Sequence, residues 1–536
     1  MNNFDASAQT LSLAIFCAVV SITLLLCIMT SAEADDLGEF YTGYRSLSPT
    51  RNGLAIAGDY ISAATVLNTI GIIALTGYDG LILALSTALS LLLLMFLLAE
   101  PLRNAGKFTM GDALTRRSPS RSVRITTSAV TLLALVPMMV VQLAGAGYLI
   151  TLILGFSGEG VRTGCIIVLG LLMIAYATIG GMKGTALIQI IKIVVLTGAA
   201  TAVAILVMDR FSWSPGELLS QAQQGSGAGP AFLSSGLQFG TDLTGRLDTI
   251  SGMLTVVIGA AVLPHVTMRM YTAHSAPAIR RAMSWAVGVV IYVVLLIAVI
   301  GVGATALIGA RDIAAASPQG SNAILHIGQA VVEGSGTLST LVFTAIATAV
   351  FLTLLSSVAG MTLACASSIA HDLAAHGVHR GGLSAAREMT TARLAGLGVG
   401  LAAIGLAILV QDWTLQALIT LSFCIGASAI TPALVYSLFW RRYTRTGLLA
   451  TLIGGSLCVL VLLTFSSVVS GGPHALITSR DFSWFPLHTT GLISIPAGFL
   501  LGWLGTVFSD RRTQQREQQR YEAVEPRILA GTDAPG

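Results

Sequence analysis

Three hydroxyl residues lie close together in an otherwise apolar part of the chain. They are Thr353, Ser356 and Ser357, in the stretch TLLSSVAGMTLACASSIAHDL. Their spacing places all three on one side of an α-helix. Oxygens on one side suit a hard cation, and because these oxygens are neutral, a monovalent ion is favoured over Ca²⁺ or Mg²⁺, which normally recruit carboxylates. The alternative is that each hydroxyl is bonded to a carbonyl of its own helix.

A second polar set interrupts the apolar run IAGDYISAATVLNTIGIIALTGYDG at residues 56–80. It contains Asp59, Asn68 and Thr69 among glycines and small polar residues. This composition is typical of a broken membrane helix, whose freed carbonyls and half-helix ends can bind ions and small anions. The alternative is close helix packing through small residues.

A third interruption, VIGAAVLPHVTMRMYTA, covers residues 257–273. Pro264 predicts a kink or break because proline lacks the N–H that a helix needs. His265 beside it is ionisable, and it is either a structural residue with satisfied hydrogen bonds or a group that binds a ligand or a proton. Gln142, Gln189 and Lys192 are further polar residues within apolar runs. A buried charge is costly, so Lys192 either faces the bundle or extends to the inner membrane surface.

The composition of the chain indicates whether these polar groups lie in water or in a membrane. The chain has 536 residues, of which 54% are hydrophobic and 10% charged, whereas soluble proteins have about 25% charged residues. Several apolar runs exceed the roughly 18 residues needed to cross a bilayer. We therefore expect a polytopic helical membrane protein. All six cysteines lie in apolar runs without metal or disulfide spacing. No nucleophile–base set or phosphate loop indicates an enzyme, and no nucleic-acid partner is expected.

Thirteen spans are predicted, the first retained rather than cleaved as a signal peptide. They cover residues 9–31, 53–78, 80–100, 122–155, 160–181, 184–208, 248–275, 282–309, 338–370, 391–411, 413–440, 446–469 and 487–509. Most Lys and Arg residues, Arg269 included, fall in alternate loops and adjoining span ends. This asymmetry predicts an outside N-terminus and a cytoplasmic C-terminus.

Both interrupted spans open a set of five. An odd number of spans inverts the second set relative to the first, as in inverted-repeat transporters. The predicted units are an N-terminal helix with an inner loop (1–52), a first repeat (53–208), an outer loop (209–247), a second repeat (248–440), two C-terminal helices (441–509) and a cytoplasmic tail (510–536). The tail is expected to be a solvated helix with a disordered end.

Several motifs distributed over most of the chain are specific when taken together. They are GDYISAAT, TGYDG, AEPLRNAGKFTMGDAL, QLAGAGYLI, YATIGGMKGTALIQIIK, LPHVTMRMYT, ASSIAHDL and SLFWRRYTRTG. In these motifs the chain resembles the sodium:solute symporter family, in particular its cation/acetate symporter branch of acetate and monocarboxylate permeases. The resemblance implies an all-α LeuT-type fold with five-plus-five inverted repeats and about 13 transmembrane helices, located in a bacterial plasma membrane.

The resemblance also implies a sodium site. In the family, two carbonyls of the first broken helix combine with hydroxyl side chains of the eighth core helix. The matching residues here are Gly58 and Ile61 for the carbonyls, and Thr353, Ser356 and Ser357 for the hydroxyls. Asp372 follows Ser357 by fifteen residues, as the family pattern requires.

The chain departs from the family at two positions. Sugar- and proline-transporting members carry Asp where this chain has Gln189, and Gln where it has Lys192. The missing carboxylate argues against a second sodium site. A cation at Lys192 suits an anionic substrate.

The expected function is Na⁺-coupled uptake of a short monocarboxylate, such as acetate, propionate or pyruvate, by alternating access. Its carboxylate would meet the N-terminal amides of half-helices. Candidate contacts are Asn68, Thr69, Gln142, Pro264 and His265, with Met138, Met139 and Leu263 limiting substrate size. The alternatives are proton coupling through Asp59 or His265, another solute, or a membrane sensor, which the short tail after Asp510 disfavours. The sequence does not indicate an oligomeric state.

Overall fold

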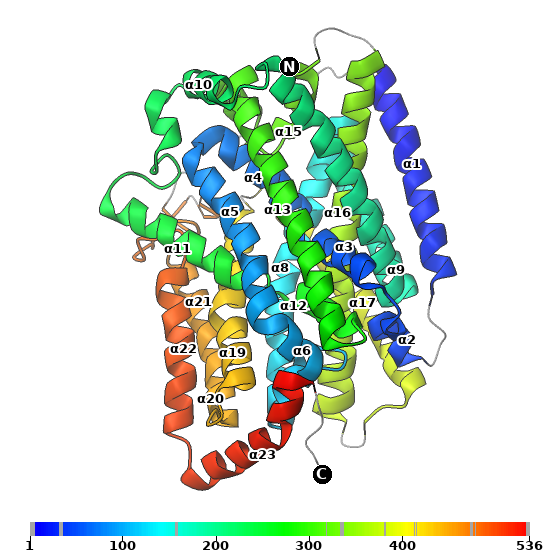
Figure 1. Ribbon diagram of the computed structural model, residues 1–536, viewed down its shortest axis with the longest axis vertical. Coiled ribbons are helices and arrows are strands. Elements are labelled where there is room, and N and C mark those ends of the chain that lie inside the picture. Colours follow the sequence, from blue (N-terminus) through cyan, green and yellow to red (C-terminus); the bar gives the residue numbers. More distant parts are fainter. Residues whose placement is uncertain are drawn as a thin grey trace.

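Long apolar helices dominate the structure, as the hydropathy predicts. The computed structural model describes residues 6–31, 36–155, 159–317, 319–332, 337–379, 382–411, 413, 415–471, 475–477 and 479–531. Within these residues, β-structure is limited to two isolated bridges, Ser466 to Phe485 and Ser470 to Ile477. The helices form one bundle (Figure 1). The predicted all-α membrane architecture is confirmed.

The bundle is built mainly from helices of membrane-spanning length and their continuations. These are α1 (Ala6–Met29), α5 (Tyr78–Leu93), α8 (Arg121–Leu154), α9 (Glu159–Arg210), α11 (Leu243–Gly259), α13 (Ala276–Leu307), α16 (Thr337–Ser367), α17 (Ala385–Leu409), α18 (Gln416–Ile425), α19 (Thr431–Phe439), α20 (Arg445–Leu449), α21 (Gly455–Thr464) and α22 (Gly491–Val507). Short helices are α2 (Leu37–Thr42), α3 (Pro49–Tyr60), α4 (Ala63–Thr76), α6 (Ala99–Ala105), α7 (Met110–Thr115), α10 (Pro215–Gly225), α12 (Pro264–Thr267), α14 (Ala310–Ala316), α15 (Ala323–Ala330) and the tail helix α23 (Arg511–Ala530).

Helix α9 contains two predicted spans. Its 52 residues would extend about 78 Å if straight, far more than the roughly 30 Å of a bilayer core. Gly181 interrupts it with φ 53° and ψ −153°, a conformation open to glycine but strained for other residues. The structure has 10 helices long and apolar enough to span a membrane within its described part. Counting α9 as two spans and adding the α3–α4 pair and α22 gives the thirteen predicted.

Helices from the two predicted repeats interleave. Helix α16 packs along α9, and α3 packs against both α9 and α13. The short helix α12 is fully surrounded, since Pro264, His265, Val266 and Thr267 are all buried. Both interrupted spans therefore lie in the middle of the bundle.

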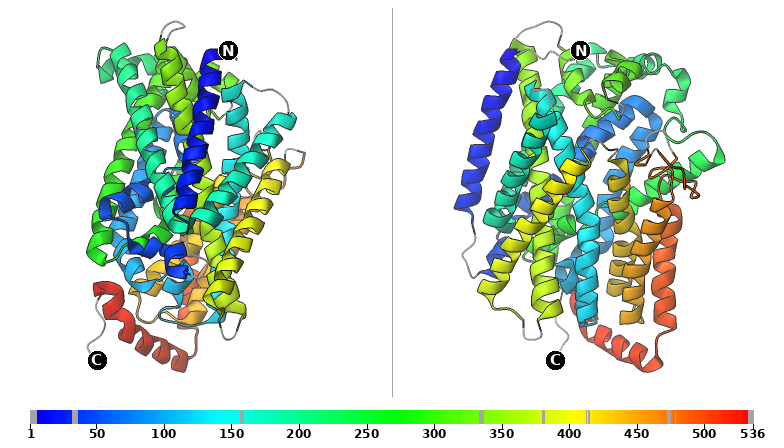
Figure 2. Two further views of the ribbon diagram at one scale, coloured as in Figure 1. Left: turned by 90° about the vertical axis from the view of Figure 1, so that its right-hand side faces the viewer. Right: turned by 180° about the vertical axis from the view of Figure 1, so that it is seen from behind.

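The two ends of the bundle are distinct in Figures 1 and 2. Helix α1 begins at the end that carries α10, and α23 crosses the opposite end; we call these the α10 end and the α23 end. The tail forms a helix, as expected, and only Glu517, Tyr521 and Ile528 of α23 are buried. Tyr521 donates to the carbonyl of Leu438 at 2.6 Å, which docks one side of this otherwise solvated helix on the bundle. The expected disordered end falls largely on residues 532–536, which lie outside the described residues.

Candidate functional site

The first interrupted span is broken between α3 and α4, as predicted. Ile61 and Ser62 have extended backbone conformations, and the two helices meet at a bend of 55°. Ser62 caps α4 by accepting a hydrogen bond from the Thr65 amide at 3.1 Å, the usual role of a serine before a helix. The last four carbonyls of a helix lack partners within it. The break therefore frees carbonyls at the end of α3, where Gly58 and Ile61 lie.

Two glycines let the end of α3 approach its neighbours. A Cβ at Gly58 would lie 2.5 Å from the Gln189 carbonyl oxygen of α9. A Cβ at Gly360, on α16, would lie 2.7 Å from Asp59 Oδ1. Any larger side chain would collide at either place. The backbones of α3, α9 and α16 consequently meet around Asp59.

The second interrupted span is broken where proline predicts it. Helix α11 ends at Gly259, and Pro264 starts α12, a position where its missing N–H costs no helical hydrogen bond. The break exposes the amide of Ala261, which donates to Ser90 Oγ at 3.0 Å. His265 follows, 6% exposed, and its Nδ1 has no hydrogen-bond partner among the described atoms.

The hydroxyls of Thr353, Ser356 and Ser357 are buried on α16. Each donates to the carbonyl four residues earlier, at 2.6, 2.7 and 2.8 Å respectively. The alternative reading, in which the helix satisfies these hydroxyls, is therefore realised. It does not remove their capacity to bind a cation, because a hydroxyl that donates its proton keeps its oxygen lone pairs.

Gln189 joins the broken helix to α16. Its Nε2 donates to Asp59 Oδ1 at 2.6 Å and to the Ser356 carbonyl at 3.0 Å. The Gln189 amide thus bridges the two elements of the predicted sodium site.

Lys192 lies one turn further along α9 and is completely buried. Its Nζ lies 3.5 Å from Ser357 Oγ. Of the two predicted orientations, the one facing the bundle is right, and extension to the inner surface is wrong. The amine of Lys192 therefore lies beside the predicted ion ligands.

Arg269 is the residue that sequence reasoning missed. The charge asymmetry assigns it to the inward loops and adjoining span ends, but it is 2% exposed and forms an ion pair through Nε with Asp59 Oδ2. Its other nitrogens donate to the Met182 carbonyl at 3.2 Å and to Thr185 Oγ1 at 3.3 Å. The available signal was its position five residues after Pro264, because an arginine inside an interrupted span must be paired. The ion pair links the two breaks directly.

A cavity of about 140 Å³ lies between the breaks and reaches residues 238–239 toward the α10 end. Asn68, Thr69 and His265 line it, together with apolar residues that include Met138 and Leu263. Pro264 and Met139 are not among its lining residues. The structure therefore brings three of the five predicted substrate contacts to one cavity.

Gln142 does not line this cavity but lies one helical turn beyond Met138, which does. Residues four apart share a helix face. Gln142 is 1% exposed, and neither its Oε1 nor its Nε2 has a hydrogen-bond partner among the described atoms. Buried amides without partners are rare in folded proteins, so this side chain is a candidate to contact a ligand.

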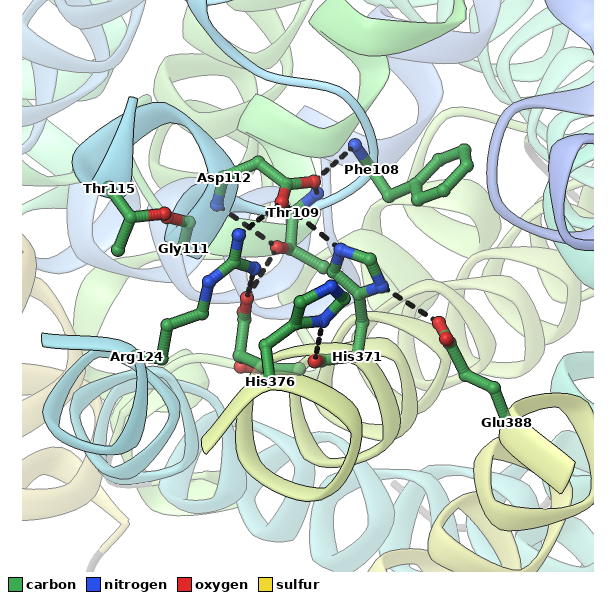
Figure 3. Close-up of polar contacts among 11 residues, drawn as sticks. Phe108, Thr109, Gly111, Asp112, Thr115, Arg124, His371, His376 and Glu388 are labelled. Atoms are coloured by element: carbon green, nitrogen blue, oxygen red, sulfur yellow. Dashed lines mark hydrogen bonds and ion pairs between the residues drawn. The ribbon is translucent and has the colours of Figure 1, made fainter. Parts of the chain in front are cut away.

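A separate polar cluster near the α23 end contains Asp372, and Figure 3 shows its neighbours Asp112, Arg124 and His371. Asp112, His371 and Asp372 could by distance hold a metal ion, since their ligand atoms lie within 4.8 Å of one another. Asp372 Oδ1 instead accepts from Thr109 Oγ1 and Arg124 Nη1, both at 2.8 Å. We interpret the cluster as an ion-pair network that joins α7 and α8 to the end of the α16 span.

Comparisons with known proteins identify the family. The family model described as the sodium:solute symporter family matches residues 40–455. The chain is 35% identical over 511 residues to a "Monocarboxylic acid transporter" of Corynebacterium glutamicum, covering 93% of this chain and 91% of that protein. It is 34% identical over 502 residues to the "Uncharacterized symporter YwcA" of Bacillus subtilis, covering 93% and 94%.

Among solved structures, the fold is similar to that of a Na⁺-coupled sialic acid symporter in a substrate-bound, outward-open state. The TM-score is 0.71 at 14% identity, covering 93% of this chain and 98% of that one. This likeness shows the fold, a LeuT-type helical bundle.

Proposed function

Because the chain belongs to the sodium:solute symporter family, we propose that it couples uptake of a short-chain monocarboxylate to the Na⁺ gradient by alternating access. The protein is a multi-span membrane transporter, not an enzyme. The C. glutamicum relative, described as a monocarboxylic acid transporter, supports the substrate class. Acetate, propionate and pyruvate are the candidates within it, and the bacterial plasma membrane, with the α23 end cytoplasmic, is the proposed location.

The observation that carries the proposal is the bridge that Gln189 makes between α3 and α16. Its amide contacts Asp59 at the end of the broken helix and the Ser356 carbonyl on α16. Carbonyls of Gly58 and Ile61 and the oxygens of Thr353, Ser356 and Ser357 are therefore candidates to surround one Na⁺. Five neutral oxygens suit a monovalent ion.

The substrate would occupy the cavity between the breaks. Ser62 and Thr65, at the start of α4, line this cavity, and the N-terminus of a helix stabilises a carboxylate. Asn68, Thr69 and His265 supply polar atoms at the cavity, and Gln142 lies one helical turn beyond it. Apolar lining residues such as Met138 and Leu263 favour a short aliphatic chain. Pro264 contributes by breaking the helix that places His265.

Coupling follows if Na⁺ joins α3 to α16. An ion held between the broken helix and α16 would stabilise one arrangement of the bundle and raise the affinity for the substrate in that arrangement. Loss of the ion toward the α23 end would weaken both contacts and release the substrate.

The test is uptake of radiolabelled acetate into proteoliposomes, with and without a Na⁺ gradient and against a panel of competing carboxylates. Removing one ligand oxygen in Ser356→Ala or Ser357→Ala should raise the Na⁺ concentration for half-maximal uptake at least about tenfold, equal to roughly 1.4 kcal/mol. Ser367→Ala is the matched control, because Ser367 is buried on the same helix and donates to the Leu363 carbonyl at 2.7 Å. Uptake that follows a proton gradient without Na⁺ would overturn the ion assignment.

A further inference from the structure

The α23 end contains a second cavity, distinct from the one between the breaks. It has a volume of about 720 Å³ and lies where α6, α7, the start of α8 and the tail helix α23 meet. Basic side chains dominate its lining: Arg45, Arg103, Lys107, Arg116, Arg121 and Arg527, in addition to Arg124. Asp112 is the one carboxylate among its described lining residues. The cavity is therefore strongly positive.

The charge of Asp112 is already engaged elsewhere. Its Oδ1 lies 2.9 Å from Arg124 Nη2 and 3.1 Å from His371 Nε2, as Figure 3 shows. Arg124 in turn also pairs with Asp372 at 2.8 Å. These groups form part of the wall of the cavity and offset one another. Arg45, Arg103, Lys107 and Arg121 line the same cavity.

Two of these arginines are held in place by neutral acceptors. Arg45 Nε donates to the Tyr271 carbonyl at 3.2 Å. Arg103 donates through Nε to the Ala273 carbonyl and through Nη2 to the His274 carbonyl at 2.7 Å. Carbonyls orient a guanidinium without cancelling its charge, so both side chains are positioned for an anion in advance. The carbonyls belong to residues 271–274, between α12 and α13.

The basic groups also disfavour one another. Burial, and next the positive charge of Arg527, lower the pKa of Arg45 below its usual range. An anion that binds nearby stabilises a cation surrounded by other positive charges. A positively charged cleft also raises the local concentration of anions.

We infer that this cavity binds a phosphate-bearing polyanion. Guanidinium groups match the oxygens of phosphate in pairs, which a lysine or a single charge does not. A multiply charged ligand gains from several cations at once, whereas a monocarboxylate carries one charge. The proposal thus assigns the cavity to a ligand other than the transported solute.

The ligand would hold the tail helix against the bundle. Arg527 belongs to α23, while Arg45 and Arg103 belong to the body of the protein. Asn104, next to Arg103, donates to the Ile528 carbonyl of α23 at 3.2 Å, so the tail already contacts this wall. An anion between Arg527 and the other arginines adds a charged link to that contact.

The test measures binding of phosphate-bearing probes to the purified full-length protein. This measurement does not depend on transport activity. Inorganic pyrophosphate is the soluble probe, measured by calorimetry in detergent at low salt. The lipid arm compares the apparent Tm in nanodiscs of phosphatidylcholine alone with that in nanodiscs that also contain cardiolipin. Saturable pyrophosphate binding indicates a soluble phosphate ligand, and stabilisation by cardiolipin alone indicates a lipid headgroup; either result supports the site.

The variant Lys107→Gln/Arg121→Gln removes two exposed basic residues of the lining and should weaken the observed binding at least tenfold. The matched control is Arg387→Gln/Arg393→Gln, which removes the same charge from α17, outside the cavity. The inference is overturned if neither probe acts, or if both double variants weaken binding equally.

Discussion

The ammonium nitrogen of Lys192 lies 3.5 Å from the hydroxyl oxygen of Ser357. A buried amine thus stands beside an oxygen that we propose as a Na⁺ ligand. When this amine is protonated, its charge and that of Na⁺ repel each other, and at a distance of a few ångströms the repulsion costs several kcal/mol even at an effective dielectric constant near 20. Lys192 should therefore weaken the binding of Na⁺.

Replacing this lysine with an uncharged residue of similar length tests the relationship. We expect Lys192→Met to lower the Na⁺ concentration for half-maximal uptake by about tenfold or more, since 1.4 kcal/mol corresponds to a factor of ten. The measurement is acetate uptake against Na⁺ concentration in proteoliposomes. Lys183→Met, which removes a half-buried lysine of the same helix, should leave the curve unchanged. A higher Na⁺ requirement in Lys192→Met would mean that the lysine supports the site.

The buried ion pair between Asp59 and Arg269 should be important for stability. Asp59→Asn leaves Arg269 buried without a carboxylate, which costs about 3–5 kcal/mol when one partner of a buried pair is lost. The control is Glu100→Gln, which breaks a surface pair with Arg280, whose side chain is 71% exposed; surface pairs contribute about 1 kcal/mol or less. The apparent Tm of the purified proteins should fall clearly in the first variant and little in the second. Equal losses would contradict the structural role.

The breaks in the spans could be predicted because their causes are local. Pro264 cannot donate within a helix, and Ser62 is a good cap for the half-helix that follows, so both interruptions are visible in a few residues of sequence. The spacing of Thr353, Ser356 and Ser357 likewise depends only on helical geometry.

The partners of the charged residues could not be predicted, because they come from distant parts of the chain. Arg269 is paired with a residue 210 positions away, and local composition does not reveal which helix will lie opposite. For Lys192, sequence left two orientations open, and the packing of α9 against α16 decided between them. Arg269 lies close to a span end, so counting it as a loop residue fitted the charge asymmetry and hid its burial.

The stability of the protein should depend on pH through Asp112, which lies outside the membrane spans. Burial raises the pKa of its carboxyl group, but the hydrogen bond and charge of His371, together with Arg124, outweigh burial and hold the pKa well below its usual range. A depressed folded-state pKa stabilises the protein above the unfolded value, near 3.9, and this contribution is lost as the pH falls through the folded pKa. Asp112→Asn should therefore lower the apparent Tm at pH 7.

The difference in apparent Tm between wild type and Asp112→Asn should narrow as the pH falls below about 4. The ionised carboxyl group of the wild type then contributes less to the stability of the folded protein. Thermal unfolding at several pH values measures this gap. Asp312→Asn, at an exposed position of α14, is expected to follow the wild-type curve. A gap that stays constant down to acidic pH would show that the charge of Asp112 is not what stabilises the cluster.

Substitution of Gln142 distinguishes a role of this residue in substrate binding from a role in folding. Its amide is buried with neither polar atom paired among the described residues, and such a group costs about 1–3 kcal/mol. Gln142→Leu should therefore raise the apparent Tm, because leucine removes the unpaired amide at similar volume. If the amide contacts the carboxylate of the substrate, the same variant should raise the KM for uptake about tenfold or more. A protein that gains stability when a polar residue is removed is expected to have kept that residue for function.

Ser456→Ala provides the comparison for Gln142, because Ser456 on α21 is also buried and its hydroxyl has no partner among the described atoms. It does not line the cavity between the breaks, so its removal should raise the apparent Tm modestly and leave the KM unchanged. An unchanged KM in Gln142→Leu would place the amide outside the substrate site. A lower Tm in Gln142→Leu would instead show that the amide has a structural partner, such as a buried water.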